Sequence, residues 1–472
     1  MKEVNKNFIY NILYQVFIYI IPLITTPYIS RVLGANNIGI YSYTYSIVSY
    51  FMLAGLLGIN NLGSRSIAQT NSLNDREKLS YKFTSIYLLQ FILCVIMLVL
   101  YLIFSIFVFQ DYRTIFFIQT IFLVSTMFDI NWLYFGLENF KVTISRNIII
   151  KLLSLVLIFM FVKQEQDLWI YTLIMSLSTL LSQLYLWLFV KKYVSFVKVK
   201  WQDLLANLKQ ALILFIPVIA YSIYRVMDKT MLGAMSGTTE LGYYENAEKI
   251  INIPISFITA IGTVLLPHMS KNKKIQSKKY TDQMKNSIRL SLTLIIPMMF
   301  GLLAIANDFA IVFFGEEFVK SGNIILLLVP CILFSAISNI IRTSYLIPQE
   351  KDGIYVKSTI YGAVLNLIFN LIFIPQFQAY GACIGTIIAE FTVMFYQCIK
   401  IKKEINLREI LSPIFSYLIK GVIMCFIVIL VGQFIPTISL RLFLQVITGI
   451  FIWIAMNISF IEEFFGRQRK KA

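Results

Sequence analysis

The chain has 472 residues, of which 58% are hydrophobic and 14% are charged, with a formal net charge of +17 and a mean hydropathy of +0.76. A soluble domain carries roughly 25% charged residues, so this composition excludes an ordinary soluble protein. Apolar stretches such as 91–109 reach the ~18 residues that cross a bilayer as a helix, and they lack the polar–apolar alternation of a membrane barrel. The fold class is therefore an all-α polytopic membrane protein.

Fourteen apolar segments are predicted to cross the membrane. In chain order they are 8–29, 38–61, 83–108, 114–136, 147–162, 168–190, 209–234, 246–266, 287–306, 322–347, 355–375, 380–400, 413–435 and 440–461. The polar segment 191–208 falls midway through the first twelve. The predicted organisation is an N-terminal six-helix lobe (1–190), a cytoplasmic linker (191–208), a C-terminal six-helix lobe (209–400), and two additional helices with a basic tail (401–472).

The basic residues of the loops predict the orientation. If the N-terminus is cytoplasmic, the inner segments hold 30 of the 41 Lys and Arg residues, whereas the outer segments hold only Arg31, Arg113, Lys163, Lys320 and Arg441. Cytoplasmic loops of membrane proteins carry an excess of Lys and Arg, so we expect both termini to be cytoplasmic. The same pattern explains the net charge without a nucleic-acid partner, and none is expected.

The two predicted lobes begin with similar motifs. Pro, Arg-Val, Leu-Gly-Ala and an aliphatic residue followed by Gly occur in the same order within 22–41 and within 217–244, although their spacing differs by a few residues. This order indicates an internal duplication. Because six spans precede the second copy, the lobes would share one orientation and be related by an axis along the membrane normal, as in many transporters. The substrate site is expected in a cavity between them.

Few charged residues lie inside the predicted spans, and three of them share one helical face. Arg225, Asp228 and Lys229 are spaced i, i+3 and i+4, so Asp228 neutralises only one of the two cations. Charges at membrane depth usually face a cavity or a partner. We interpret this face as a cationic cavity wall that holds an anionic head group through charge-assisted hydrogen bonds. An intramembrane ion-pair network that keeps helices in register is the alternative interpretation.

Other charged residues are candidates of a similar kind. Lys249 lies at the start of the eighth span, where Glu245 can reach it at i+4 and Glu248 precedes it. Arg31 lies near the outer interface, where a substrate contact and simple interfacial placement are both open. Asp129 falls within the fourth span, where a local capping or pairing role is equally open.

The sequence contains no recognisable catalytic or metal-binding motif. The five cysteines form no C-x-x-C pair and lie in or beside apolar stretches, and the single histidine, His268, cannot build a multi-histidine site. Neither a nucleophile–base pair nor a phosphate-binding glycine loop is present. We therefore expect neither an enzyme nor an ATP-driven pump, and we expect no cofactor.

Several motifs resemble those of one transporter family. They are RVLG at 31–34 with IGIY at 38–41, GLLG at 55–58 with GSRSIA at 63–68, NWLYFGLENF at 131–140, and AEKI at 247–250 with Pro254 and IGTVLLP at 261–267. Together they resemble the Wzx-type, polysaccharide-synthesis branch of the multidrug/oligosaccharidyl-lipid/polysaccharide exporter superfamily. The last motif also resembles flippases of lipid-linked murein precursors. Those relatives carry a cavity arginine where this chain has Lys249, which keeps the charge but loses the bidentate fork.

The resemblance implies a two-lobed transporter that works by alternating access. It would flip an undecaprenyl-diphosphate-linked oligosaccharide repeat unit across the bacterial cytoplasmic membrane for capsule, exopolysaccharide or O-antigen synthesis. A polymerase and glycosyltransferases of that machinery are candidate partners. The expected substrate-binding residues are Arg225, Lys229, Lys249 and Arg31, and the expected coupling residues are Asp228 and Glu248.

Two other functions fit the same features. A multidrug antiporter of the same superfamily would share the fold, but a cavity for organic cations should favour acidic and aromatic residues, whereas the charge at depth here is net positive. A non-transporting scaffold of the synthesis machinery is the second alternative. The sugar composition, the polymer, the oligomeric state and the energy source (protons, sodium or membrane potential) stay open at this point.

Overall fold

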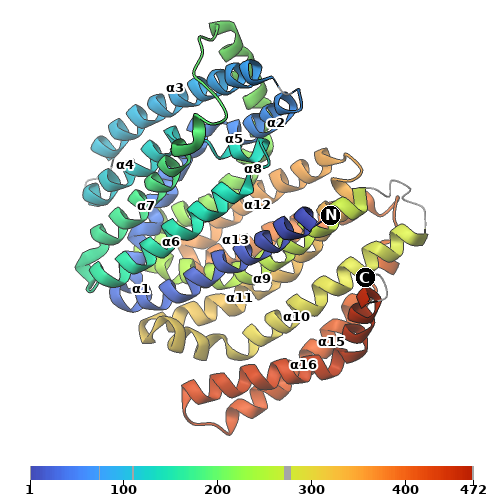
Figure 1. Cartoon of the computed structure of the whole chain (residues 1–472). Helices are drawn as coiled ribbons and strands as arrows, with labels where there is room; N and C mark the ends of the chain where they lie inside the picture. The colour runs from blue at the N-terminus through green and yellow to red at the C-terminus, as the bar shows by residue number, and fades with distance from the viewer. Residues whose placement is uncertain (1, 74, 109–110, 271–277, 470–472) are drawn as a thin grey trace. The chain divides into compact units, whose positions relative to one another are not determined.

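The computed structural model describes residues 2–73, 75–108, 111–270 and 278–469. Nearly all of these residues are helical and none of them lies in a strand (Figure 1), which confirms the all-α prediction. Helix is the expected local structure, because an apolar chain in hydrocarbon must satisfy its own backbone hydrogen bonds. The chain divides into two compact units, which we call unit 1 (Met1–Gly242) and unit 2 (Tyr243–Ala472). The lobe boundaries proposed from sequence stay a prediction.

Unit 1 is built from helices in simple succession along the chain. Its described elements are α1 (Lys2–Leu56), α2 (Ile59–Asn71), α3 (Arg76–Val108), α4 (Arg113–Met127), α5 (Asn131–Gly136), α6 (Phe140–Phe161), the 3₁₀-helix η1 (Glu165–Asp167), α7 (Leu168–Val190) and α8 (Trp201–Ser236). Helix α9 (Thr238–Ser270) begins in unit 1 and continues into unit 2.

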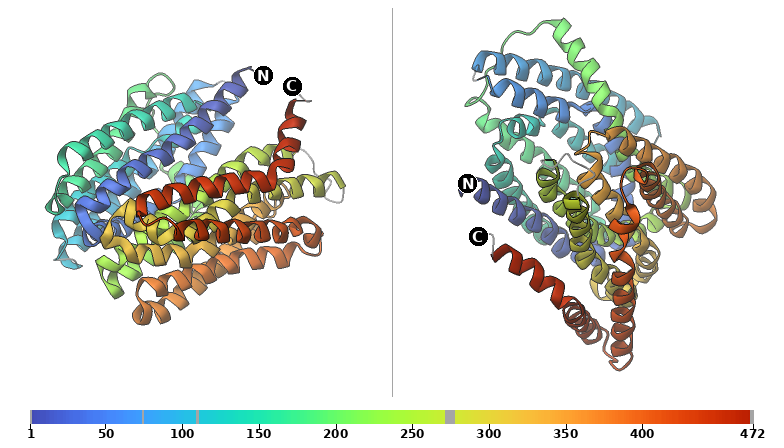
Figure 2. Two further views of the ribbon diagram at one scale, coloured as in Figure 1. Left: turned by 90° about the horizontal axis from the view of Figure 1, so that it is seen from below. Right: turned by 90° about the vertical axis from the view of Figure 1, so that its right-hand side faces the viewer.

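Unit 2 continues the all-helical pattern. Its further described elements are α10 (Lys278–Phe314), the 3₁₀-helix η2 (Glu316–Phe318), α11 (Val319–Ile341), the π-helix η3 (Arg342–Leu346), α12 (Asp352–Phe377), α13 (Ala379–Ile401), α14 (Leu407–Leu411), α15 (Pro413–Gln433) and α16 (Ile438–Arg469). Figure 2 shows α15 and α16, at the red end of the colour scale, as neighbouring helices.

The number of membrane-length helices agrees with the predicted count of about fourteen. Among the described residues, 11 helical segments are long and apolar enough to cross a membrane. One of these segments, Ile21–Asn71, holds both of the first two predicted spans, because α1 continues through a break at Gly34. Helices α8 and α9 cover the seventh and eighth predicted spans.

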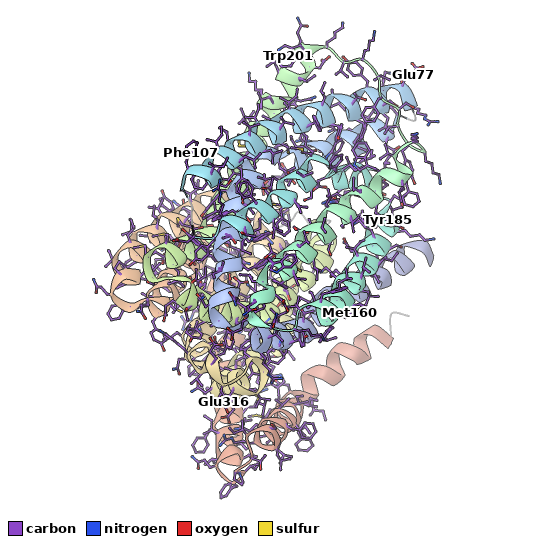
Figure 3. All side chains as sticks on the ribbon, turned by 90° about the vertical axis from the view of Figure 1, so that its left-hand side faces the viewer. Glu77, Phe107, Met160, Tyr185, Trp201 and Glu316 are labelled. Atoms are coloured by element: carbon purple, nitrogen blue, oxygen red, sulfur yellow. The ribbon has the colours of Figure 1, made fainter. Side chains whose placement is uncertain are left out.

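Large apolar side chains cover the outer surface of several helices. Phe107 of α3 and Met160 of α6 are 78% and 60% exposed, and they are labelled on the outside of the ribbon in Figure 3. Phe451 of α16 is 73% exposed. Soluble monomers rarely expose contiguous apolar patches of this kind. These faces are therefore the ones that contact lipid.

Several helix boundaries differ from the sequence prediction, and two of the differences involve charged residues. The fourth span is interrupted at 128–130, between α4 and α5, because Asp129 accepts hydrogen bonds from the backbone N–H of Asn131 at 3.0 Å and from its side-chain amide at 2.6 Å. Asp129 therefore bonds the backbone and side-chain N–H groups of the first residue of α5, whose N-cap position is held by Ile130. Helix α6 also begins seven residues before the predicted fifth span. Arg146, assigned to an inner loop from sequence, is instead a buried helical residue.

The core of unit 1 is organised around Trp132. Its indole N–H donates to Gln90 at 3.0 Å, its ring lies 5.4 Å from that of Phe83, and Gly63 of α2 packs directly against it. Any side chain at Gly63 would overlap the indole. Two of the family-like motifs, 63–68 and 131–140, therefore pack on each other and serve the fold of this unit.

Candidate functional site

Helix α8 carries the densest group of charges that the sequence placed at membrane depth. Arg225, Asp228 and Lys229, here called the α8 cluster, lie within about one turn of this helix. Asp228 is only 4% exposed, whereas both cations are half-buried. A carboxylate removed from water this completely needs charged or hydrogen-bonding partners. The cluster carries two positive charges against one negative charge, as its spacing predicted.

The α8 cluster is held against the second half of α1 by polar contacts. Thr230 shares a hydrogen bond of 2.8 Å with Ser46, and it donates to the hydroxyl of Tyr50 at 3.4 Å. Asp228 lies close enough to the same Tyr50 hydroxyl to interact with it electrostatically. Buried hydroxyl bonds of this kind fix the rotation of one helix against another. The face of α8 that carries the charges is therefore set by α1.

Two glycine breaks bring α1 and the α8–α9 junction together. Gly34 inside α1 has φ 72° and ψ 172°, and Gly237 between α8 and α9 has φ 90° and ψ 166°. Each break is followed five residues later by another glycine, Gly39 or Gly242. Non-glycine residues rarely adopt these angles. The spacing identifies Gly237, and not Gly233, as the counterpart of Gly34 in the internal repeat.

The two glycine segments pack on each other reciprocally. A Cβ on Gly39 would overlap the carbonyl oxygen of Thr238, and a Cβ on Gly242 would overlap that of Ala35. Thr238 and Ala35 each follow directly after a helix break, so the same contact is made twice with the partners exchanged. A hydrogen bond of 2.5 Å from Thr238 to Asn36 closes the junction. The sequence repeat is thus visible as a local two-fold relation inside unit 1.

Arg31 lies in the part of α1 that precedes the Gly34 break. It is exposed and stands 15 residues before Ser46, the α1 residue that bonds Thr230 of α8. Arg31 and Ser46 therefore lie on opposite sides of the break, and a substrate contact by Arg31 stays a prediction.

Lys249 lies on α9 in unit 2. Its Nζ lies 3.5 Å from a carboxylate oxygen of Glu245, one turn earlier in α9, which confirms the ion pair predicted from sequence. The Lys249 side chain is 39% exposed, whereas that of Glu245 is 13% exposed. Glu248 is half-buried. Lys249 thus keeps part of its ammonium group accessible while one carboxylate partly neutralises it.

A second buried polar group in unit 1 was not anticipated. Arg146, 5% exposed, donates to Asn131 at 2.8 Å, to Gln183 at 3.4 Å and to Asn147 at 2.8 Å. Asn131 in turn donates to Asp129, so an amide connects the guanidinium to the carboxylate. We call these residues the Arg146 network. Because Arg146 was assigned to a loop, its local sequence did not predict this network. Its partner Asn131, however, is the first residue of the family-like motif at 131–140.

The described part of the chain contains no grouping of three or more His, Cys, Asp or Glu side chains that could hold a metal ion. Both charged groups of unit 1 are instead organised by hydroxyls and amides. Such an arrangement can bind an anion or move with a change of charge. It contains no positioned nucleophile and base within the residues described above.

Comparison with known proteins identifies the family to which the chain belongs and proteins that share its fold. A family model described as polysaccharide biosynthesis protein matches residues 4–273, and a second, described as lipid II flippase MurJ, matches residues 152–456. A putative O-antigen transporter from Shigella dysenteriae is 23% identical over 391 residues, which cover 81% of this chain and 96% of that protein.

Two solved structures show the same fold. One is a lipid II flippase MurJ in an inward closed conformation, with a TM-score of 0.79 at 15% identity, covering 96% of this chain and 100% of that one. The other is an inward-facing multidrug resistance MATE family transporter of the MOP superfamily, with a TM-score of 0.56 at 14% identity, covering 82% and 98%. At these identities the likeness concerns the fold.

Proposed function

Because the chain belongs to the polysaccharide biosynthesis protein family, we propose that it is a flippase for a lipid-linked oligosaccharide. The substrate would be a polyprenyl-diphosphate-linked repeat unit that moves from the inner to the outer leaflet of the bacterial cytoplasmic membrane. Capsule, exopolysaccharide and O-antigen are the polymers it would serve. The relatives named as an O-antigen transporter and a lipid II flippase support this substrate class.

The observation that carries the proposal is the net positive α8 cluster. A diphosphate presents several anionic oxygens, and Arg225 can bind two of them with its planar guanidinium while Lys229 adds a compact charge. Hydrogen bonds between ionised partners are roughly twice as strong as neutral ones. The cluster itself has two cations and one carboxylate, so its own charge is net positive and complementary to that of a diphosphate. Lys249 and Arg31 stay predicted substrate contacts.

Asp228 is the proposed coupling residue. Its carboxylate is almost fully buried beside two cations and near the hydroxyl of Tyr50. Arrival of an anionic substrate would compete with Asp228 for those cations, so its charge can link substrate binding to helix movement. Glu248 of α9 is the second candidate for this role. Proton, sodium and membrane potential are the energy sources that this arrangement admits.

The proposed orientation has both termini in the cytoplasm. After Arg146 is removed from the inner loops, those loops still hold 29 of the 41 basic residues, against five in the outer ones. Such an imbalance keeps the basic loops on the cytoplasmic side. The candidate partners, a polymerase and glycosyltransferases, would then act on opposite sides of the membrane, before and after the substrate is moved.

The direct test uses the purified full chain in proteoliposomes that contain a fluorescent lipid-linked oligosaccharide. Flipping makes the inner-leaflet label accessible to an impermeant quencher added outside. We expect quenching beyond the outer-leaflet half in vesicles with protein, and only that half in vesicles without it. Ethidium efflux is measured in parallel, because the multidrug-antiporter alternative predicts cation transport. Ethidium transport without lipid flipping would overturn the proposal, and neither activity would favour the scaffold alternative.

A further inference from the structure

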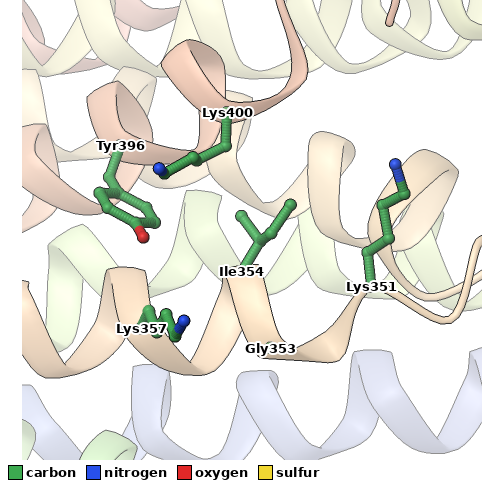
Figure 4. A pocket seen from close by; sticks show the side chains of 6 residues that line it. All are labelled: Lys351, Gly353, Ile354, Lys357, Tyr396 and Lys400. Atoms are coloured by element: carbon green, nitrogen blue, oxygen red, sulfur yellow. The ribbon is translucent and has the colours of Figure 1, made fainter.

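A pocket of about 340 Å³ opens within unit 2, between the start of α12 and the end of α13. Its lining, here called the lysine pocket, consists of Lys351, Gly353, Ile354, Lys357, Tyr396 and Lys400. Figure 4 shows Tyr396 and Lys400 descending from α13 opposite Ile354 and Lys357 of α12. A Cβ on Gly353 would meet no atom within 4 Å, so that wall of the pocket stays open.

The three lysines are not equally neutralised. Lys351 forms an ion pair with Glu404, which also accepts a hydrogen bond from the Tyr345 hydroxyl. The hydrogen bond from Lys351, followed by the one from Tyr345, holds the pKa of Glu404 below its ordinary value of 4.5, so the carboxylate is ionised at neutral pH. Within the part of the chain that the structure describes, neither Lys357 nor Lys400 makes an ion pair.

Lys400 is instead positioned by an aromatic ring. Its Nζ lies 5.4 Å from the ring centroid of Tyr396, one turn earlier in α13. Such a contact orients an exposed ammonium group at a modest energy, ~0.5–1 kcal/mol, without removing its charge. Lys357 and Lys400 therefore leave the pocket with two positive charges beyond the Lys351–Glu404 pair. An anion with several acceptor oxygens, such as a phosphate group, is the matching ligand.

The surface next to the pocket is apolar and exposed. The rings of Tyr361 and Tyr396 lie 5.1 Å apart at its edge. From there Val364, Ile368 and Leu371 continue along one exposed face of α12 with helical spacing. A soluble phosphate compound would gain nothing from this face. A lipid could place its phosphate in the pocket and its acyl chains along α12.

We propose that the lysine pocket binds the phosphate of an anionic glycerophospholipid, such as phosphatidylglycerol, from the leaflet that faces the basic loops. Basic pockets between transmembrane helices on the cytoplasmic side bind lipid head groups by this combination of charge and apolar contact. The pocket shares no residue with the α8 cluster, and binding there does not require that the chain flip any substrate. It ties the end of the α12–α13 pair to the charged surface of the bilayer.

The test compares two charge-matched double variants of the purified full chain. Lys357→Gln with Lys400→Gln removes the two unpaired lysines of the pocket. Lys402→Gln with Lys403→Gln removes the same charge from exposed residues just beyond α13 that do not line the pocket. Binding of phosphatidylglycerol and of zwitterionic phosphatidylcholine is measured by native mass spectrometry during lipid titration in a neutral detergent.

We expect the pocket variant to bind phosphatidylglycerol about thirtyfold more weakly, at roughly 1 kcal/mol for each of the two lysines near a lipid surface. The control variant should stay within about twofold of the unmodified chain, and phosphatidylcholine binding should be unchanged in both. Equal weakening in the two variants would mean general charge attraction and would overturn the proposal.

Two competition arms distinguish the sources of phosphate. Inorganic phosphate or pyrophosphate in excess should displace little phosphatidylglycerol, because neither contacts the apolar face of α12. Full displacement by pyrophosphate would show a site for soluble phosphate compounds instead. Displacement by an equimolar amount of undecaprenyl diphosphate would reassign the pocket to the transported lipid. Because no arm measures flipping, failure here and failure of the proposed function are separate results.

Discussion

The α8 cluster and the lysine pocket use similar side chains in opposite surroundings. In the α8 cluster two half-buried cations lie beside a carboxylate that is 4% exposed. In the lysine pocket Lys357 and Lys400 are exposed at helix ends, and the nearby Glu404 pairs with Lys351. Charges at membrane depth are expensive unless they are paired or face water, whereas lysines at helix ends reach the interface.

The surroundings of each group of charges limit what that group can do. Removing a cation from the α8 cluster leaves Asp228 less compensated in a nearly water-free place, so the effects should be large and concern transport. Removing a lysine from the pocket exposes no buried charge, so the effects should be small and concern lipid binding only. The variants below test this contrast in order of decreasing expected effect.

Replacing both cations of the α8 cluster, Arg225→Gln with Lys229→Gln, should produce the largest loss. Truncating one partner of a buried charge contact typically costs on the order of 2–5 kcal/mol, which is roughly thirtyfold or more in binding. We expect lipid-linked oligosaccharide to accumulate on the cytoplasmic face while protein abundance stays normal. Abundance that falls in proportion to activity would favour the helix-registering network.

Lys420→Gln is the matched control for that change. Lys420 is also an intramembrane cation, but its ammonium donates to the carbonyl of Met456 at 2.8 Å and to Asn457 at 2.9 Å, between α15 and α16. Its loss should lower stability by about 1 kcal/mol and leave flipping intact. A flipping defect equal to that of the α8 double variant would contradict a specific role of the α8 cations in transport.

Gly39→Ala should disrupt the packing that supports the α8 cluster and leave the lysine pocket unchanged. The added Cβ would overlap the carbonyl of Thr238, so α1 and the α8–α9 junction must move apart, at about 1–3 kcal/mol or more. We expect lower thermal stability and impaired flipping, whereas the folded fraction should still bind phosphatidylglycerol in unit 2. Gly301→Ala, where a Cβ meets nothing within 4 Å, is the control and should be neutral.

Asp228→Asn keeps the shape of the α8 cluster and removes its negative charge. If the carboxylate couples substrate binding to movement, the variant should reach the membrane at normal abundance and bind substrate, yet flip it on the order of tenfold more slowly or worse. Substrate affinity and flipping rate are measured separately in proteoliposomes. An unchanged flipping rate would remove Asp228 from the coupling mechanism.

Glu404→Gln should give the smallest effect, and in the opposite direction. It releases Lys351 and adds one positive charge to the lysine pocket, so phosphatidylglycerol should bind about fivefold more tightly, at roughly 1 kcal/mol per lysine. Since its folded-state pKa is lowered, the Glu404 carboxylate stays ionised above pH 4.5, and the ion pair is lost only as the pH falls through that lowered value. Lipid binding by the unmodified chain should therefore be constant from neutral pH down to that point. Weaker binding by the variant would contradict the charge assignment.

Much of the candidate site could be predicted, but not its connections. The spacing of Arg225, Asp228 and Lys229 indicates a shared face, and the i+4 spacing correctly predicts the Lys249–Glu245 pair, because helix geometry is local. Arg146 was misplaced because its position near the end of a span looks like a loop until Asn131 and Gln183, 15 and 37 residues away, are seen to bind it. The lysine pocket could not be predicted either, because its lining residues on α12 and α13 are far apart in the chain.

Hydropathy and charge along the chain suffice to predict the all-α class, the number of membrane-length helices and the concentration of basic residues in alternate loops. These properties depend on hydrophobicity and charge along a continuous stretch, and lipid leaves the backbone of such a stretch only the helix. The tertiary structure decided which distant segments meet: the reciprocal contact of Gly39 with Thr238 and of Gly242 with Ala35, and the Arg146 network. Contacts between residues far apart in the chain depend on packing, and no local pattern specifies them.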